Sequence, residues 1–268
     1  IVAPMVSLSQ GLTDAGYFEI DINGSLNKLL MNNIMDNVDI RTAAASSKAM
    51  NIKVNSISNN VSFDLAGTVK SFQAASYSSG ALMASSINKV KISAGNLGAD
   101  VIADSLDSAA IKNITVKGNI SGSIRAQSIK SISALTLDQA LISVQDSIGK
   151  VKIKNNVTDS FVLAGYDIGT DLASFLDDTL QTGTIGSFSF GGTFSNTYVA
   201  AGAMTENIYA GLYSLLPSNA KYSAGSGMMK VKGNTILTGS GENFGFYSAG
   251  DIKTSFSSTG NFDVIRNL

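Results

Sequence analysis

One pattern of apolar residues occurs three times along the chain, in IKNITVKGNISGSIRA (residues 111–126), IGKVKIKNNVTDSFVL (residues 148–163) and IGSFSFGGTFSNTYVA (residues 185–200). In each stretch, six apolar positions follow one another at spacings of 3, 2, 4, 4 and 2 residues. Alternation with a period of two indicates β-strands, because successive side chains of a strand point to opposite faces. A repeat this short cannot bury its own apolar side chains, so it predicts a solenoid of stacked coils.

The start of the repeat can be followed in both directions from these stretches. The shortest intervals, from Val69 to Ile87 and from Ile129 to Ile148, are 18 and 19 residues, and longer intervals indicate a coil with an insertion. We place the starts at Leu26, Ala49, Val69, Ile87, Ile111, Ile129, Ile148, Ile185, Met228 and Ile252.

The handedness follows from which patterns are missing. A left-handed hexapeptide helix needs apolar residues six and twelve positions after Ile148, where the chain has Lys154 and Ser160. Parallel crossovers are otherwise almost always right-handed. The sequence therefore predicts an all-β fold, a right-handed parallel β-helix with coils of roughly 18–19 residues and two larger loop insertions. We expect residues 1–25 to form an N-terminal cap and residues 26–268 the β-helix, with insertions at 165–184 and 203–227.

The corners between strands are rich in glycine and asparagine. These residues tolerate the positive φ angle that a sharp corner needs. Stacked asparagine side chains also form hydrogen bonds from one coil to the next, so we interpret these corners as structural. They are Ser58-Asn59-Asn60, Gly95-Asn96, Gly118-Asn119, Asn155-Asn156, Gly191-Gly192 and Gly233-Asn234.

Composition excludes several kinds of chemistry. The chain has no cysteine and no histidine, so disulfides, thiolate metal sites and catalytic triads based on Cys or His are ruled out. It has only three glutamates, at Glu19, Glu206 and Glu242, and we expect no enzyme activity and no required cofactor. The net charge is −1, and nothing in the sequence indicates nucleic acid as a partner. No apolar run reaches the 18 residues of a membrane span.

Many lysines fall on strand positions that alternate with the apolar core. Two interpretations are open: a basic stripe on one face, or ordinary solvated residues. The lysines are Lys89, Lys91, Lys112, Lys117, Lys150, Lys152 and Lys154.

The first insertion places four carboxylates within twelve residues. Carboxylate oxygens are the ligands that Ca²⁺ prefers, so this loop is a candidate calcium site, although it lacks EF-hand spacing. The alternative is an acidic, solvated loop with a helical turn at residues 172–180. The candidate ligands are Asp167, Asp171, Asp177 and Asp178.

The second insertion is apolar and carries tyrosines. Such an excursion either folds back over the solenoid or docks on a neighbouring molecule. The candidate interface residues are Tyr209, Tyr213, Leu215, Leu216 and Tyr222.

The run from Ile148 to Gly202 resembles the repeats of large secreted β-strand-repeat surface proteins of environmental bacteria. Those repeats look like IGxVxVxGxVxxSxIxAGxD, followed by an acidic insertion and a second IGxVxVGG. A weaker similarity connects the 18- to 19-residue coil with bactofilins, which are cytoskeletal β-helices that polymerise end to end. The resemblance implies a secreted, non-enzymatic structural protein.

We therefore expect a structural protein of a prokaryotic cell surface or extracellular assembly: a surface-layer, sheath or filament subunit. Its copies would associate through lateral or end-to-end contacts between solenoids. Two alternatives remain open. One is an adhesin that binds surface glycans, and the other is a carbohydrate-active β-helix of the polysaccharide lyase or tailspike kind.

Overall fold

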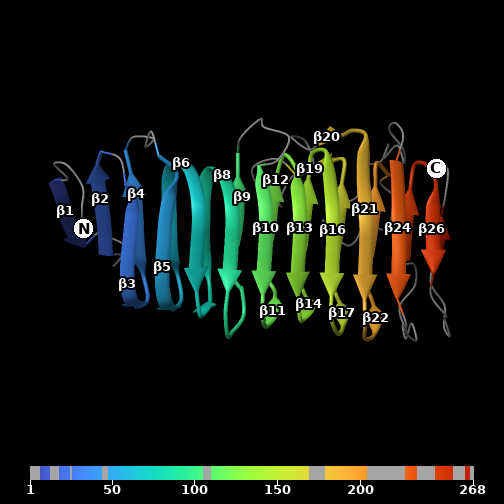
Figure 1. Ribbon diagram of the computed structural model, residues 1–268, viewed down its shortest axis with the longest axis horizontal. Coiled ribbons are helices and arrows are strands. Elements are labelled where there is room, and N and C mark those ends of the chain that lie inside the picture. The colour runs from blue at the N-terminus through green and yellow to red at the C-terminus, as the bar shows by residue number, and fades with distance from the viewer. Residues whose placement is uncertain are drawn as a thin grey trace. The chain divides into compact units, whose positions relative to one another are not determined.

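The structure is a computed structural model that describes residues 7–12, 18–24, 26–43, 48–104, 110–168, 179–203, 227–233, 245–255 and 263–265. The chain divides into two compact units, Ile1–Gln127 and Ser128–Leu268. Each is a β-solenoid of parallel strands, with coils of about 20 residues and about nine turns in the two units together. The described residues contain strands and no helix (Figure 1). The predicted all-β parallel solenoid is confirmed, while its right-handedness stays a prediction.

The coils of unit 1 build two main sheets, and its last three coils also have a short strand or an isolated bridge between the long and the third strand. Its long-strand sheet contains β3 (Lys28–Ile34), β5 (Met50–Ile57), the second halves of β6 (Val61–Ala74) and β8 (Gly80–Ile92), and β10 (Ile111–Val116). Its third-strand sheet contains β2 (Phe18–Asn23), β4 (Val38–Thr42), the first halves of β6 and β8, β9 (Asp100–Ala103) and β12 (Ser123–Ala126). The short strands β7 (Ser76–Tyr77) and β11 (Asn119–Ile120) are bridged through Leu97.

Unit 2 repeats this arrangement. Its long-strand sheet contains β13 (Ile129–Ala134), β16 (Ser147–Ile153), β21 (Gly183–Phe190), β24 (Gly227–Gly233) and β26 (Ile252–Ser255). The short strands are β14 (Thr136–Asp138), β17 (Val157–Thr158) and β22 (Phe194–Ser195). The third-strand sheet contains β15 (Leu141–Val144), β18 (Phe161–Ala164), β23 (Tyr198–Ala201), β25 (Gly245–Ser248) and β27 (Asp263–Ile265).

One further strand lies at the N-terminal edge of unit 1. Strand β1 (Ser7–Leu12) pairs with β2 in the antiparallel direction, from Ser7 opposite Asn23 to Leu12 opposite Phe18. Strand β2 in turn pairs with β4 in parallel. The edge of β2 that faces away from β4 is therefore occupied, and β2 itself belongs to the stack.

The predicted register holds in the central coils and slips by one residue at two places. Val69 lies beside Ile87 in unit 1, and Ile148 lies beside Ile185 in unit 2, as predicted. The partner of Val69 on its other side is Met50 rather than Ala49, and the partner of Ile185 is Met229 rather than Met228. Met50 and Met229 are 1% and 0% exposed. A slip of one residue exchanges the inward and outward faces of a strand, so the structure corrects both positions.

The second half of each repeat is divided in two by a corner that the sequence pattern does not show. In unit 2 this corner has residues with positive φ, namely Gln139, Asp159 and Asn196. Beyond the corner, Val162 is fully buried, whereas Phe161, which the spacing pattern placed in the core, is half-buried. Phe161 stacks on Tyr198 of the next coil, with ring centroids 5.0 Å apart.

Asparagine side chains connect successive corners. The Oδ1 atom of Asn96 accepts a hydrogen bond from the Asn119 backbone N–H (2.9 Å), and Asn60 donates from Nδ2 to Asn37 Oδ1 (3.1 Å). Asn60 also has the positive φ, 53°, that was expected of a corner residue. The structural interpretation of these asparagines is therefore confirmed at these corners.

Unit 1 contains a buried tyrosine whose removal has a measurable consequence. Tyr77 packs against Phe63 and Phe72, and its hydroxyl donates to the carbonyls of Val61 (2.6 Å) and Ala81 (2.8 Å). Replacing Tyr77 with Phe leaves those buried carbonyls without this donor. We expect Tyr77→Phe to lower the free energy of unfolding by about 1–3 kcal/mol, measured by denaturant unfolding.

The same substitution changes the alkaline limb of the stability curve. Burial raises the pKa of the Tyr77 hydroxyl, with smaller contributions from Asp100 and Asp39. The folded state therefore keeps its proton at a pH where the unfolded chain has lost it. The stability due to Tyr77 is fully present below its ordinary pKa of about 10 and falls by about 1.4 kcal/mol per pH unit above it. Equal alkaline slopes in the wild type and Tyr77→Phe would contradict this.

Candidate functional sites

The first insertion begins and ends as a short hairpin on unit 2. Strand β19 (Tyr166–Asp167) pairs antiparallel with β20 (Thr179–Leu180). At its base, Gly165 has a φ of 81°, and its carbonyl accepts a hydrogen bond from the Gln181 backbone N–H (2.8 Å). A Cβ atom on Gly183 would lie 2.1 Å from the Ala164 carbonyl oxygen. Two glycines therefore allow the insertion to close tightly.

Of the four predicted calcium ligands, one lies among the described residues. Asp167 accepts a hydrogen bond from Gln145 through Oδ2 (2.5 Å). Asp171, Asp177 and Asp178 lie outside the described residues. Within the described part of the chain, no group of three or more Asp, Glu, His or Cys residues could hold a metal ion. The calcium loop stays a prediction.

The predicted interface of the second insertion also lies outside the described residues, which omit positions 204–226. Tyr209, Tyr213, Leu215, Leu216 and Tyr222 belong to it. Next to it in the chain, all four residues of β23 are buried, and so are those of β25. Both faces of the third-strand sheet of unit 2 are therefore shielded from solvent at these strands. At β15, the hydroxyl of Ser143 donates to the carbonyl of Tyr166 (2.6 Å).

A basic surface covers the long-strand sheet of unit 2, and we call it the unit 2 lysine sheet. None of its strands contains Asp or Glu. In the parallel register, Ser131 lies beside Lys150 and Lys150 beside Ser187, while Ser189 lies beside Lys232. Two strands that carry lysines, β16 and β24, thus flank the serines of β21, while Lys230 of β24 lies beside Lys253 of β26. The exposed lysines on this sheet and at its corner are Lys130, Lys150, Lys152, Lys154, Lys230, Lys232 and Lys253.

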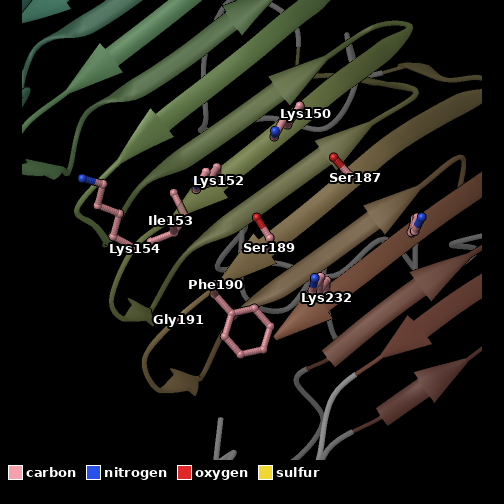
Figure 2. Close-up of a pocket in the computed structure, with 10 residues that line it drawn as sticks. Lys150, Lys152, Ile153, Lys154, Ser187, Ser189, Phe190, Gly191 and Lys232 are labelled. Carbon is pink, nitrogen blue, oxygen red and sulfur yellow. The ribbon is translucent and has the colours of Figure 1, made fainter. Parts of the chain in front are cut away.

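A shallow groove runs over the centre of this sheet. Its volume is about 590 Å³. Figure 2 shows Ser187 and Ser189 on β21, between the lysines of β16 on one side and Lys232 of β24 on the other. Within the described residues, no carboxylate forms an ion pair with the lysines of the groove. The polar side chains that line it are Lys150, Lys152, Lys154, Ser187, Ser189, Lys230 and Lys232.

Unit 1 separates its charges between two sheets. Its long-strand sheet also contains no Asp or Glu, although β6 carries Asp64 in its other half. We call it the unit 1 lysine sheet; its lysines are Lys28, Lys53, Lys70, Lys89, Lys91 and Lys112. The third-strand sheet has the opposite character, and we call it the carboxylate sheet. Its acidic residues, including one that directly follows β9, are Glu19, Asp21, Asp39, Asp64, Asp100 and Asp104.

Two arginines accompany the carboxylates of unit 1. Arg41 forms ion pairs with Glu19 and, at 3.4 Å, with Asp39. Arg125 lies beside Ile102 in the parallel register. Six carboxylates against two arginines leave this sheet acidic.

Part of the lysine series could be predicted from the sequence. The absence of Asp and Glu from the long strands could not, because it becomes visible only when the strands are aligned coil by coil.

Comparison of the chain with family models, with curated proteins and with solved structures found no match. In the part of the chain that the structure describes, no helix is long and apolar enough to cross a membrane.

Proposed function

We propose that the protein is a non-enzymatic structural component of a prokaryotic cell-surface or extracellular assembly, such as a surface layer, sheath or filament, whose copies associate through their solenoid coils. The observation that carries the proposal is the separation of charge in unit 1. One sheet presents lysines without carboxylates, and the next sheet of the same coils presents mainly carboxylates. The lysine sheet of one copy is therefore complementary to the carboxylate sheet of another.

The nature of this contact supports an extended assembly. Two different surfaces meet, so the contact is heterologous. Each bound copy keeps one unused surface, and the pair together still offers one lysine sheet and one carboxylate sheet. Such contacts continue as open arrays unless a rotation closes them into a ring. Strand β1 covers the edge of β2, so a further strand that added at this end of unit 1 would pair with β1 rather than with β2.

Salt dependence is the first expected property of such an assembly. A single exposed ion pair contributes about 0.2–1 kcal/mol, so many pairs must act together. The Debye length falls from about 10 Å at 0.1 M salt to about 3 Å at 1 M. We expect association at low salt to reverse at high salt.

The test uses the full chain in sedimentation velocity and negative-stain electron microscopy. We expect the variant Lys53→Glu/Lys89→Glu/Lys112→Glu to lose self-association at low salt, shifting its concentration midpoint at least tenfold. The matched control Lys53→Arg/Lys89→Arg/Lys112→Arg keeps the charge and should associate as the wild type does. A second variant, Asp64→Lys/Asp104→Lys, should also not self-associate on its own. It should associate with the glutamate variant when the two are mixed.

Two results would contradict the proposal: a wild type that stays monomeric at every concentration at low salt, or a glutamate variant that assembles as the wild type does. Repeating the measurement with calcium and with a chelator tests the acidic loop separately. Assemblies that dissolve only in chelator would support a calcium role for Asp167, Asp171, Asp177 and Asp178.

A further inference from the structure

We propose that the unit 2 lysine sheet is a binding surface for a linear anionic polysaccharide. This inference does not depend on self-association, because it concerns a different unit and a different partner. Its basis is the groove over β16, β21 and β24, together with the arrangement of lysine and serine around it.

The charge of this sheet has no counterpart on its own strands. The lysines at 150, 152, 230 and 232 are all exposed, and the strands that carry them contain no acidic residue. Lysines two residues apart on one strand lie about 7 Å apart and point to the same side. Such an array creates a positive potential that attracts a polyanion.

The spacing along the stack suggests the form of the ligand. Lys150 and Lys152 lie on β16, Lys232 lies on β24, and β21 with Ser187 and Ser189 lies between them (Figure 2). Lys230 also lies on β24. Two rungs correspond to about 9.6 Å at the usual distance between neighbouring strands. A polysaccharide with an anionic group on alternate sugars would place its charges on the lysine rungs. The hydroxyl groups of its uncharged sugars would face the serines.

The residue types favour a polysaccharide over nucleic acid. Single-stranded nucleic acids are held by aromatic side chains on which the bases stack, and Phe190, the aromatic residue that borders the groove, is only 4% exposed. Sequence readout of duplex DNA uses a helix or a ribbon that enters a groove, whereas this surface is a sheet of short side chains and lysines. Lysine acts as a hydrated point charge and does not require planar, bidentate geometry.

The corresponding groove of unit 1 differs in composition. It contains Lys53 and Lys91, and it is also lined by Leu30, which is 59% exposed. Its lysines are outnumbered by apolar and amide side chains. The inference therefore applies to unit 2.

The test measures binding of the full chain to hyaluronan, a polysaccharide whose carboxylates occur on alternate sugars, by isothermal titration calorimetry at low salt. We expect binding that weakens as salt rises, and no binding to uncharged dextran. The variant Lys150→Glu/Lys152→Glu/Lys230→Glu/Lys232→Glu should bind hyaluronan at least tenfold more weakly. Because all four side chains are exposed, its circular dichroism spectrum and melting temperature should match the wild type.

Two control variants separate this inference from the proposed function. The four-arginine version of the same variant should keep hyaluronan binding. The unit 1 variant Lys53→Glu/Lys89→Glu/Lys112→Glu should lose self-association and keep hyaluronan binding. The inference is overturned if the wild type does not bind hyaluronan, if the four-glutamate variant binds it within twofold of the wild type, or if a DNA duplex binds this surface more tightly than hyaluronan does.

Discussion

Replacing Phe194 with Ala is expected to be among the most destabilising single substitutions in unit 2. Phe194 is fully buried and lies within a cluster of four phenylalanine rings. Its ring centroid is 4.7 Å from that of Phe246, 5.3 Å from that of Phe190 and 6.3 Å from that of Phe188. Three of these rings come from the long and short strands of one coil, and Phe246 comes from the third strand of the next, so the cluster connects two successive coils. We expect a loss of about 3–5 kcal/mol, the usual range for Phe→Ala in a core.

The chain provides a matched control of the same residue type. Phe161 also stacks on an aromatic ring, that of Tyr198, but it is half-buried at the outside of the coil. Phe161→Ala should cost about 1–2 kcal/mol, because less apolar area returns to water. Urea unfolding followed by circular dichroism measures both variants. Equal losses for Phe161→Ala and Phe194→Ala would show that the cluster is not the core of the unit.

Periodicity alone was sufficient to predict the solenoid and most of its register. The inward positions of the long strands, such as Ile87, Ile111 and Ile148, could be read from the sequence because apolar and polar residues alternate there. Where alternation fails, the prediction fails. Ala49 and Met50 are both apolar, as are Met228 and Met229, so the sequence does not distinguish the inward residue of each pair.

The third strand of each coil was harder to predict from the sequence, again because apolar and polar residues do not alternate there. Phe161, Val162 and Leu163 are consecutive apolar residues, and the structure buries Val162 and Leu163 on opposite faces of the sheet. A strand with both faces covered has no alternation to read. The corner before it depends on Asp159 and Asn196 at positive φ, residues that also occur in ordinary turns.

The candidate surfaces could be recognised only from the alignment of strands in successive coils. A lysine at position 150 or 232 is unremarkable alone, since outward strand positions are commonly charged. What matters is that Ser189 lies beside Lys232 and Lys150 beside Ser187, on long strands that contain no Asp or Glu. These neighbours are about 40 residues apart in the chain. Their grouping could be read only after the length of each insertion was known.

Replacing Gly80 with Ala should also have a large effect, through the backbone rather than through packing. Gly80 begins β8 at a corner of unit 1, has a φ of 114° and lies beside Val61 in the parallel register. A Cβ atom at this position would lie 1.9 Å from the Val61 carbonyl oxygen and 2.7 Å from its backbone nitrogen. The methyl group meets backbone atoms, which cannot rotate away. Either β8 moves from β6 or the corner changes its conformation.

The expected loss for Gly80→Ala is about 3 kcal/mol or more, since a strained φ angle alone costs about 1–3 kcal/mol. Separation of the two strands would also weaken the hydrogen bond from the Val61 N–H to the Ser79 carbonyl (3.2 Å), and it would disturb the Val61 carbonyl that accepts from Tyr77. Ala81→Ser is the matched control, because it adds one heavy atom at the next residue on the outward side, and its stability should stay within about 0.5 kcal/mol of the wild type. Denaturant unfolding gives the free energies. Hydrogen exchange of the β6 and β8 amides shows where the loss occurs, and unchanged protection of these amides in Gly80→Ala would mean that the corner tolerates a side chain.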